Sequence, residues 1–112
     1  MNVPTFLIPV VKRQVPQSAV VRFEAYGNYT LIYVEGEGSP ILYSRCLLEM
    51  CARYPFMVRV SRHHAVNPQR VERTQHWNVI RVDGMPIKLV GRYSPVLRSG
   101  RLPQVNSFMK SV

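Results

Sequence analysis

Cysteine and long apolar runs are scarce in this sequence, and each scarcity excludes a class of protein. The 112 residues include two cysteines, Cys46 and Cys51. A single pair at this spacing completes no zinc site and is poorly placed on a helix for a disulfide, so we expect reduced thiols in or near the core of a cytoplasmic protein. No apolar run approaches the roughly 20 residues of a membrane span, and the start of the chain lacks the basic region and cleavage site of a signal peptide. We therefore expect no membrane partner.

Acidic residues are also few, and they are unevenly placed. Six acidic residues stand against fifteen lysines and arginines, which gives a net charge of +9 and a pI of about 10.3. Residues 1–52 carry four basic and four acidic groups, whereas residues 53–101 carry ten basic and two acidic ones. Solubility does not require the basic residues to be concentrated in one half of the chain. We therefore expect residues 53–101 to present a basic face to a polyanion.

Short segments rich in β-branched and aromatic residues, separated by turn residues, predict a mainly β fold. The expected strands are residues 5–11, 19–25, 29–35, 41–43, 56–60 (continued or restarted at 65–66), 70–74, 77–82 and 86–90. Tyr26–Asn28 and Asp83–Gly84 are predicted as hairpin turns, and residues 15–18 as a further turn. Pro9 confines the first segment to an edge or irregular strand.

One segment has the apolar spacing of a helix. Residues 45–53 follow Ser44, the expected N-cap, and end before the Tyr54–Pro55 pair. The expected apolar stripe consists of Leu47, Leu48, Met50 and Cys51. A single helix of about two turns excludes a helical bundle and a helix-turn-helix domain, and it fits an RNA-recognition motif poorly.

The titratable residues show no arrangement suited to catalysis or metal binding. His63 and His64 are neighbours, which point to opposite faces of an extended strand, and His76 has no partner at ligand spacing. Ser61 lies close to His63, but no acid with a triad signature accompanies them. Glycine-rich phosphate loops are absent as well. We therefore expect no catalytic residue, no metal ligand and no cofactor.

The order of four segments resembles the LytTR family of bacterial DNA-binding domains. These segments are FEAYGNYTLIYV, RCLLEMCARYP, FMVRVSRHHAVNPQRV and PIKLVGRYSPVLRSG. The resemblance runs from Ala19 to Leu102, and Phe56–Val71 is its most specific part. Family positions are matched by Glu24, Asn28, Tyr29, Arg59, Arg62, Asn67, Arg92 and Tyr93. Ser61 stands where the family has histidine, His63 where it has serine, and Gly91 where it has arginine.

The resemblance implies a fold and a way of binding. The implied fold is mainly β, an elongated stack of small antiparallel sheets and hairpins with one short α-helix. The implied function is sequence-specific binding of double-stranded DNA by loops that enter its grooves, for transcription regulation. Base contacts carried over are Asn28, Tyr29, Arg62 and Arg92. Expected contacts to the DNA backbone are Arg59, Ser61, His63, His64, Arg70, Arg73, Arg98 and Arg101.

The expected organisation is a single DNA-binding domain with two short flanks. Residues 1–18 form an N-terminal extension with a possible edge strand, residues 19–102 the LytTR-like domain, and residues 103–112 a flexible tail. Most members of the family are response regulators with a receiver domain, which is not evident here, so we expect a stand-alone or excised output domain. A homodimer on direct-repeat sites is a further expectation from the family.

Two other functions stay open at this stage. One is a single-stranded nucleic-acid or RNA-binding β module, in which Tyr26, Tyr29, Tyr33 and Tyr43 stack on bases. The other is a protein-interaction domain whose basic face meets an acidic partner. Three residues are expected to be structural instead. Val66 would lie in the core, Asn67 would form a turn before Pro68, and Trp77 would pack on its hairpin.

Overall fold

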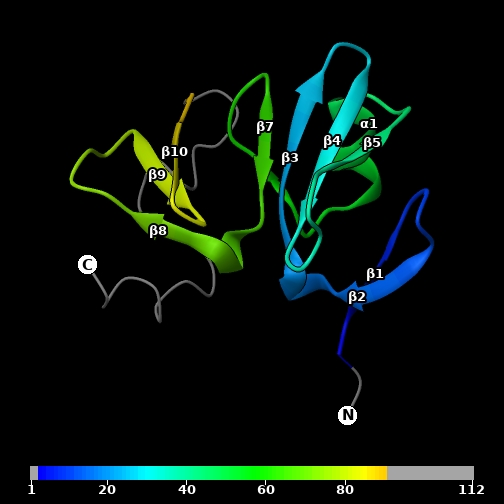
Figure 1. Ribbon diagram of the computed structural model, residues 1–112. Coiled ribbons are helices and arrows are strands. Elements are labelled where there is room, and N and C mark those ends of the chain that lie inside the picture. The colour runs from blue at the N-terminus through cyan, green and yellow to red at the C-terminus, as the bar shows by residue number, and fades with distance from the viewer. Residues whose placement is uncertain (1–2, 91–112) are drawn as a thin grey trace.

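The computed structural model describes residues 3–90, and these form three antiparallel sheets and one α-helix (Figure 1). The strands are β1 (Thr5–Ile8), β2 (Arg13–Pro16), β3 (Val20–Tyr26), β4 (Tyr29–Val34), β5 (Ile41–Tyr43), β6 (Val58–Arg59), β7 (His64–Val66), β8 (Val71–Arg73), β9 (Val79–Val82) and β10 (Met85–Lys88). The helix is α1 (Leu47–Arg53), and two 3₁₀ turns are η1 (Gln17–Ala19) and η2 (Pro68–Arg70). The strand orders are β1-β2, β5-β4-β3-β7-β6 and β10-β9-β8. The predicted fold class, mainly β with small antiparallel sheets and one short helix, is confirmed.

The five-stranded sheet separates two cores because successive residues of a strand point to opposite faces. In β7, Ala65 enters the first core and its neighbour Val66 enters the second, and both are fully buried. The first core contains Phe6, Ile8, Val15, Val20, Phe23, Ile32, Val34, Ile41, Leu47, Met50, Met57 and Ala65. The second contains Val21, Val60, Val66, Val71, Ile80, Val82, Ile87 and Leu89. Helix α1 and the N-terminal hairpin therefore share one core, and the three-stranded sheet forms the other.

The N-terminal hairpin differs from the prediction. Residues 15–18 were expected to be a turn, but β2 continues through Pro16 and pairs Val15 with Phe6, and the chain then turns in η1. The turn that joins β1 to β2 lies earlier, where Val10 and Lys12 adopt φ angles of 73° and 61°. Such angles favour glycine or asparagine, and neither is present, so this turn has no local signal in the sequence. Phe6 packs edge-on against Tyr54, with ring centroids 4.9 Å apart, which ties the hairpin to the first core.

Helix α1 begins later than expected. Ser44 is not its N-cap, because Cys46 occupies that position. The Cys46 backbone N–H and thiol both donate to the Glu49 carboxylate, at 3.4 and 3.5 Å, and these two bonds fix the first turn. Leu47 and Met50 are buried, whereas Leu48 is 66% exposed. No helix within residues 3–90 is long and apolar enough to cross a membrane, and both cysteines are free thiols.

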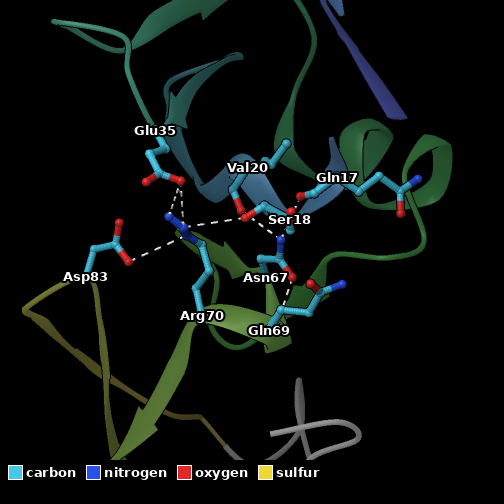
Figure 2. A network of polar contacts seen from close by, with 8 residues as sticks. All are labelled: Gln17, Ser18, Val20, Glu35, Asn67, Gln69, Arg70 and Asp83. Atoms are coloured by element: carbon cyan, nitrogen blue, oxygen red, sulfur yellow. Dashed lines mark hydrogen bonds and ion pairs between the residues drawn. The ribbon is translucent and has the colours of Figure 1, made fainter. Parts of the chain in front are cut away.

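Asn67 anchors the connection between the two larger sheets (Figure 2). Its side chain is buried, and its amide N–H groups donate to the carbonyl oxygens of Gln17 and Val20, at 2.9 and 2.8 Å. Its amide oxygen accepts from the Gln69 N–H at 3.0 Å, which caps η2. The prediction that Asn67 is a turn former is confirmed. It also joins segments about fifty residues apart, which the sequence did not indicate.

Candidate functional site

Two hairpin turns lie next to each other at one end of the five-stranded sheet (Figure 1). One is the β3–β4 turn, Gly27–Asn28, and the other is the β6–β7 turn, residues 60–63. The Ala25 N–H donates to the His63 carbonyl oxygen at 2.8 Å, which extends the β3–β7 pairing up to the turns. Gly27 has a φ of 61°, and a side chain there would strain the turn. We call the surface formed by these two turns the turn edge.

A groove of about 380 Å³ lies at the turn edge. Its walls come from β3, the N-terminal end of α1 and the β6–β7 turn. The lining residues are Ala25, Gly27, Cys46, Leu47, Leu48, Arg59, Arg62 and His63. Arg62 and His63 are exposed, and so are the Gly27–Asn28 turn and Tyr29. The fold thus places Asn28 and Tyr29 on a turn next to the one that carries Arg62 and His63, more than thirty residues further along the sequence.

Arg59 and Ser61 shape the β6–β7 turn from within. The Arg59 guanidinium donates to the carbonyl oxygens of Ser61 and Arg62, at 3.2 and 3.1 Å. The Ser61 hydroxyl accepts from the His63 N–H at 3.2 Å. These three hydrogen bonds, one part-buried and two exposed, hold the backbone of the turn in one conformation, in which the Arg62 and His63 side chains face outward. Arg62 makes no ion pair within residues 3–90, so its guanidinium is available to a ligand.

The adjacent histidines are separated by the sheet, as the alternation of a strand predicts. His63 is exposed at the turn edge, whereas His64 is half-buried on the other face, opposite Glu24 in β3. Burial lowers the pKa of His64; the Glu24 carboxylate opposes this shift, and the Arg22 guanidinium adds to it. Burial tends to raise the pKa of Glu24, but hydrogen bonds from Arg22 and Tyr33 outweigh it, and the pKa is lowered. His64 is therefore neutral at pH 7.

Arg22 is a buried cation that the sequence did not single out. Only 7% of the residue is exposed, and its guanidinium lies 3.7 Å from the centroid of the Tyr33 ring. It also forms an ion pair with Glu24 at 2.8 Å. A buried charge needs such partners, because an unpaired one would be strongly destabilising. Arg22 and Tyr33 thus belong to the interior, and Tyr33 is not presented for stacking.

Two other tyrosines are presented at the turn edge. Tyr26 and Tyr29 face each other across the β3–β4 hairpin and are 63% and 45% exposed. Tyr43 is half-buried and packs against the first core. Of the four tyrosines considered for base stacking, these two are the ones that a ligand could reach, and they flank Asn28.

Arg70 lies at the junction of the two larger sheets and not at the turn edge (Figure 2). Its guanidinium forms ion pairs with Glu35 at 2.8 Å and with Asp83 at 3.6 Å. It also donates to the Ser18 carbonyl oxygen at 3.4 Å. The side chain is 16% exposed. Arg70, expected as a contact to the DNA backbone, thus holds the β4–β5 loop against the β9–β10 turn.

The remaining expected residues lie elsewhere. Arg73 is half-buried at the end of β8, whereas Arg92, Arg98 and Arg101 lie outside the described residues. Trp77, expected to pack on its hairpin, lies on the β8–β9 loop and is 63% exposed. No group of three or more histidine, cysteine or acidic side chains within residues 3–90 is arranged to hold a metal ion.

The fold resembles a solved structure, although sequence comparison finds no relative. No protein-family model and no curated protein matches the chain. Among solved structures, the chain is similar to the "LytTr DNA-binding domain of putative methyl-accepting/DNA response regulator from Bacillus cereus". The two share 17% sequence identity with a TM-score of 0.57, over 88% of this chain and 95% of that one. The protein therefore has a LytTR-type fold.

Proposed function

We propose that the protein binds double-stranded DNA sequence-specifically and regulates transcription, by inserting the two turns of the turn edge into DNA grooves. The observation that supports this proposal is that Asn28, Tyr29 and Arg62 lie on exposed, neighbouring turns of a LytTR-type fold. These are the residues that the family motif aligns with base contacts. On this proposal the protein is a cytoplasmic, non-catalytic bacterial regulator that needs no cofactor.

The chemistry of the turn edge supports the assignment of roles. An arginine presented on a short turn can make a bidentate contact to guanine O6 and N7, and an asparagine can do the same for adenine N6 and N7. Arg62 and Asn28 are those residue types, and both side chains are exposed. The Arg59 guanidinium donates to the Arg62 carbonyl oxygen, so the turn is already ordered in the free protein. Preorganisation of this kind lowers the entropic cost of binding.

A salt titration tests whether the protein binds duplex DNA at all. We expect the affinity for a random duplex to fall steeply with salt, with a log–log slope of about −0.9 for each phosphate neutralised. Fluorescence anisotropy of a labelled duplex measures this. An absence of binding at low salt would exclude DNA binding and leave an acidic protein partner as the better explanation of the basic half.

Arg62→Ala tests sequence readout, with Arg53→Ala as the matched control. Arg53 is also exposed but lies at the opposite end of α1, away from the groove. A cognate site is first selected from random duplexes. We expect Arg62→Ala to reduce discrimination between cognate and random duplexes by about 1–3 kcal/mol, and Arg53→Ala to leave that difference unchanged. If Arg62→Ala weakened binding to the cognate and the random duplex equally, Arg62 would contact a phosphate and would not read a base.

The exposed tyrosine pair favours a second candidate, binding of single-stranded nucleic acid. Base stacking on an aromatic ring contributes about 1–3 kcal/mol per base. If Tyr26 and Tyr29 stack on bases, the protein prefers single strands and the Tyr26→Ala/Tyr29→Ala double variant loses that preference. On the main proposal duplex binds more tightly than either single strand at the same salt concentration.

Pairing on direct repeats is the last element of the proposal. Two copies bound in the same orientation would lie about one helical turn apart, or roughly 10–10.5 base pairs. Duplexes with two copies of the selected site at spacings from 8 to about 13 base pairs should then show a maximum of cooperative binding near that value. Affinity that does not depend on spacing would indicate independent monomers.

A further inference from the structure

The groove at the turn edge contains an exposed leucine that the proposed function does not use. Leu48, on α1, is 66% exposed and lines the groove together with Gly27, Arg62 and His63. The preceding residue, Leu47, is buried in the first core. Successive residues of a helix point about 100° apart, so the Leu48 side chain turns away from that core and into the groove. The groove therefore combines an apolar side chain with the polar and basic ones of the β6–β7 turn.

The start of α1 is tied to the strand that follows the β3–β4 turn. The Thr30 hydroxyl, on β4, donates to the Arg45 carbonyl oxygen at 2.7 Å. The Cys46 N–H and thiol donate to the Glu49 carboxylate, which holds the first turn of the helix. Leu48 lies within that first turn, so these bonds fix the backbone that carries it. The leucine side chain is therefore presented beside the turn edge by an ordered part of the fold.

The charges around Leu48 favour an anionic ligand. Arg62 is exposed at the groove and makes no ion pair within residues 3–90. Within the same residues, no acidic side chain lines the groove. The nearest acid along the chain, Glu49, forms an ion pair with Arg45 at 3.3 Å, which offsets its charge. A ligand that fits this surface carries negative charge and, opposite Leu48, a small apolar group.

Duplex DNA presents such an apolar group on the edge of one base. In the major groove, thymine shows a 5-methyl group beside its O4 acceptor, whereas adenine, guanine and cytosine show hydrogen-bond donors and acceptors. A leucine side chain can make no hydrogen bond to a phosphate or to a polar base edge. It gains free energy when an apolar group covers it and removes it from water. Among the parts of the duplex, the thymine methyl group therefore matches Leu48 best.

We propose that Leu48 recognises thymine by packing against its 5-methyl group, in the major groove that receives Arg62. This inference rests on the proposed function, and it adds a specificity-determining residue from α1 to the two turns of the turn edge. Removal of one methyl group from water changes affinity by about fourfold. The protein should therefore prefer thymine at one position to uracil, which has the same hydrogen-bonding groups and lacks the methyl group.

Replacement of single thymines by deoxyuracil tests the contact. A cognate duplex is selected from random duplexes, each of its thymines is replaced separately, and fluorescence anisotropy measures the affinity of the full chain. We expect one replacement to weaken binding by the parent protein about fourfold and to leave binding by Leu48→Ala unchanged. A selected site without thymine, equal affinities for all the duplexes, or a loss that Leu48→Ala retains would overturn the contact and leave the proposed function standing. No binding of duplex would overturn both.

Leu42→Ala is the matched control for Leu48→Ala. Leu42 is 45% exposed on β5, and its neighbour Ile41 lies in the first core, so Leu42 points from the face of the sheet opposite α1. We expect Leu42→Ala to keep the preference of about fourfold for thymine, and Leu48→Met, which retains an apolar side chain of similar size, to keep most of it. Circular dichroism checks that each variant folds. Loss of the preference in Leu42→Ala as well would overturn a specific role for Leu48.

Discussion

Removal of the Asn67 side chain should strongly destabilise the fold. Asn67→Ala deletes two donated and one accepted hydrogen bond in a side chain that is 1% exposed. At about 1 kcal/mol for each bond, with a further penalty for the Val20 carbonyl oxygen left unpaired, the expected loss is about 3–4 kcal/mol. This is a large part of the roughly 5–15 kcal/mol by which a domain is stable.

Urea denaturation followed by circular dichroism measures this loss. With a slope of about 1.5 kcal/mol per molar, the midpoint should move down by roughly 2 M. Asn28→Ala is the matched control, because Asn28 is exposed on a turn, and its effect on stability should stay within about 0.5 kcal/mol. A loss of less than about 1 kcal/mol for Asn67→Ala would refute the reasoning, because it would mean that water replaces all three bonds. Folded Asn67→Ala should keep the parent's discrimination between cognate and random duplexes, whereas Asn28→Ala should lose part of it.

Three further predictions concern single side chains. Arg70→Met should cost about 1 kcal/mol in urea denaturation and no more, because the Glu35 carboxylate is 66% exposed and water screens the pair. Thr30→Val should cost about 1 kcal/mol, because the buried Thr30 hydroxyl donates to the Arg45 carbonyl oxygen at 2.7 Å; an unchanged midpoint would contradict the role of that bond. Burial lowers the pKa of His64, so the unfolded chain binds this proton more readily than the folded one, and stability should fall as the pH drops below about 6.5. The melting temperature of His64→Gln should lack that part of the pH dependence, and identical profiles would contradict it.

The sequence predicted those parts of the fold whose signal is local. Strand β4 alternates in burial, and Asp83–Gly84 form a two-residue hairpin turn with positive φ at both residues, as the sequence indicated. The turn of the N-terminal hairpin has no local signal, because Val10 and Lys12 are forced into angles that they seldom adopt. Leu48 was placed on the apolar face of the helix, but in two turns the positions that share a face with Leu47 are three and four residues on.

The sequence indicated residue types for the candidate site, and the structure shows how each of them is surrounded. Asn28 and Arg62 were identified from the motif, and both prove to be exposed, on neighbouring turns. Arg59 and Arg70 looked equivalent to Arg62 in the sequence, since each is an arginine in the basic half. The two arginines differ from Arg62 in their partners. The Arg59 guanidinium donates to carbonyl oxygens of the β6–β7 turn, and the Arg70 guanidinium forms ion pairs with two distant carboxylates. Contacts between residues so far apart in the chain cannot be predicted from local sequence patterns.

The junction between the sheets has a consequence for the length of DNA that the protein can span. The turn edge belongs to the five-stranded sheet, and Arg73, an expected contact to the DNA backbone, belongs to the three-stranded sheet. The 3₁₀ turn η2, with Asn67 and Arg70, fixes one sheet against the other. For a protein that binds as proposed, this fixed angle determines the distance and the helical phase along the duplex at which the two sheets meet the DNA. Changes at the junction would then alter the length and phasing of the DNA footprint while leaving the preferred bases the same.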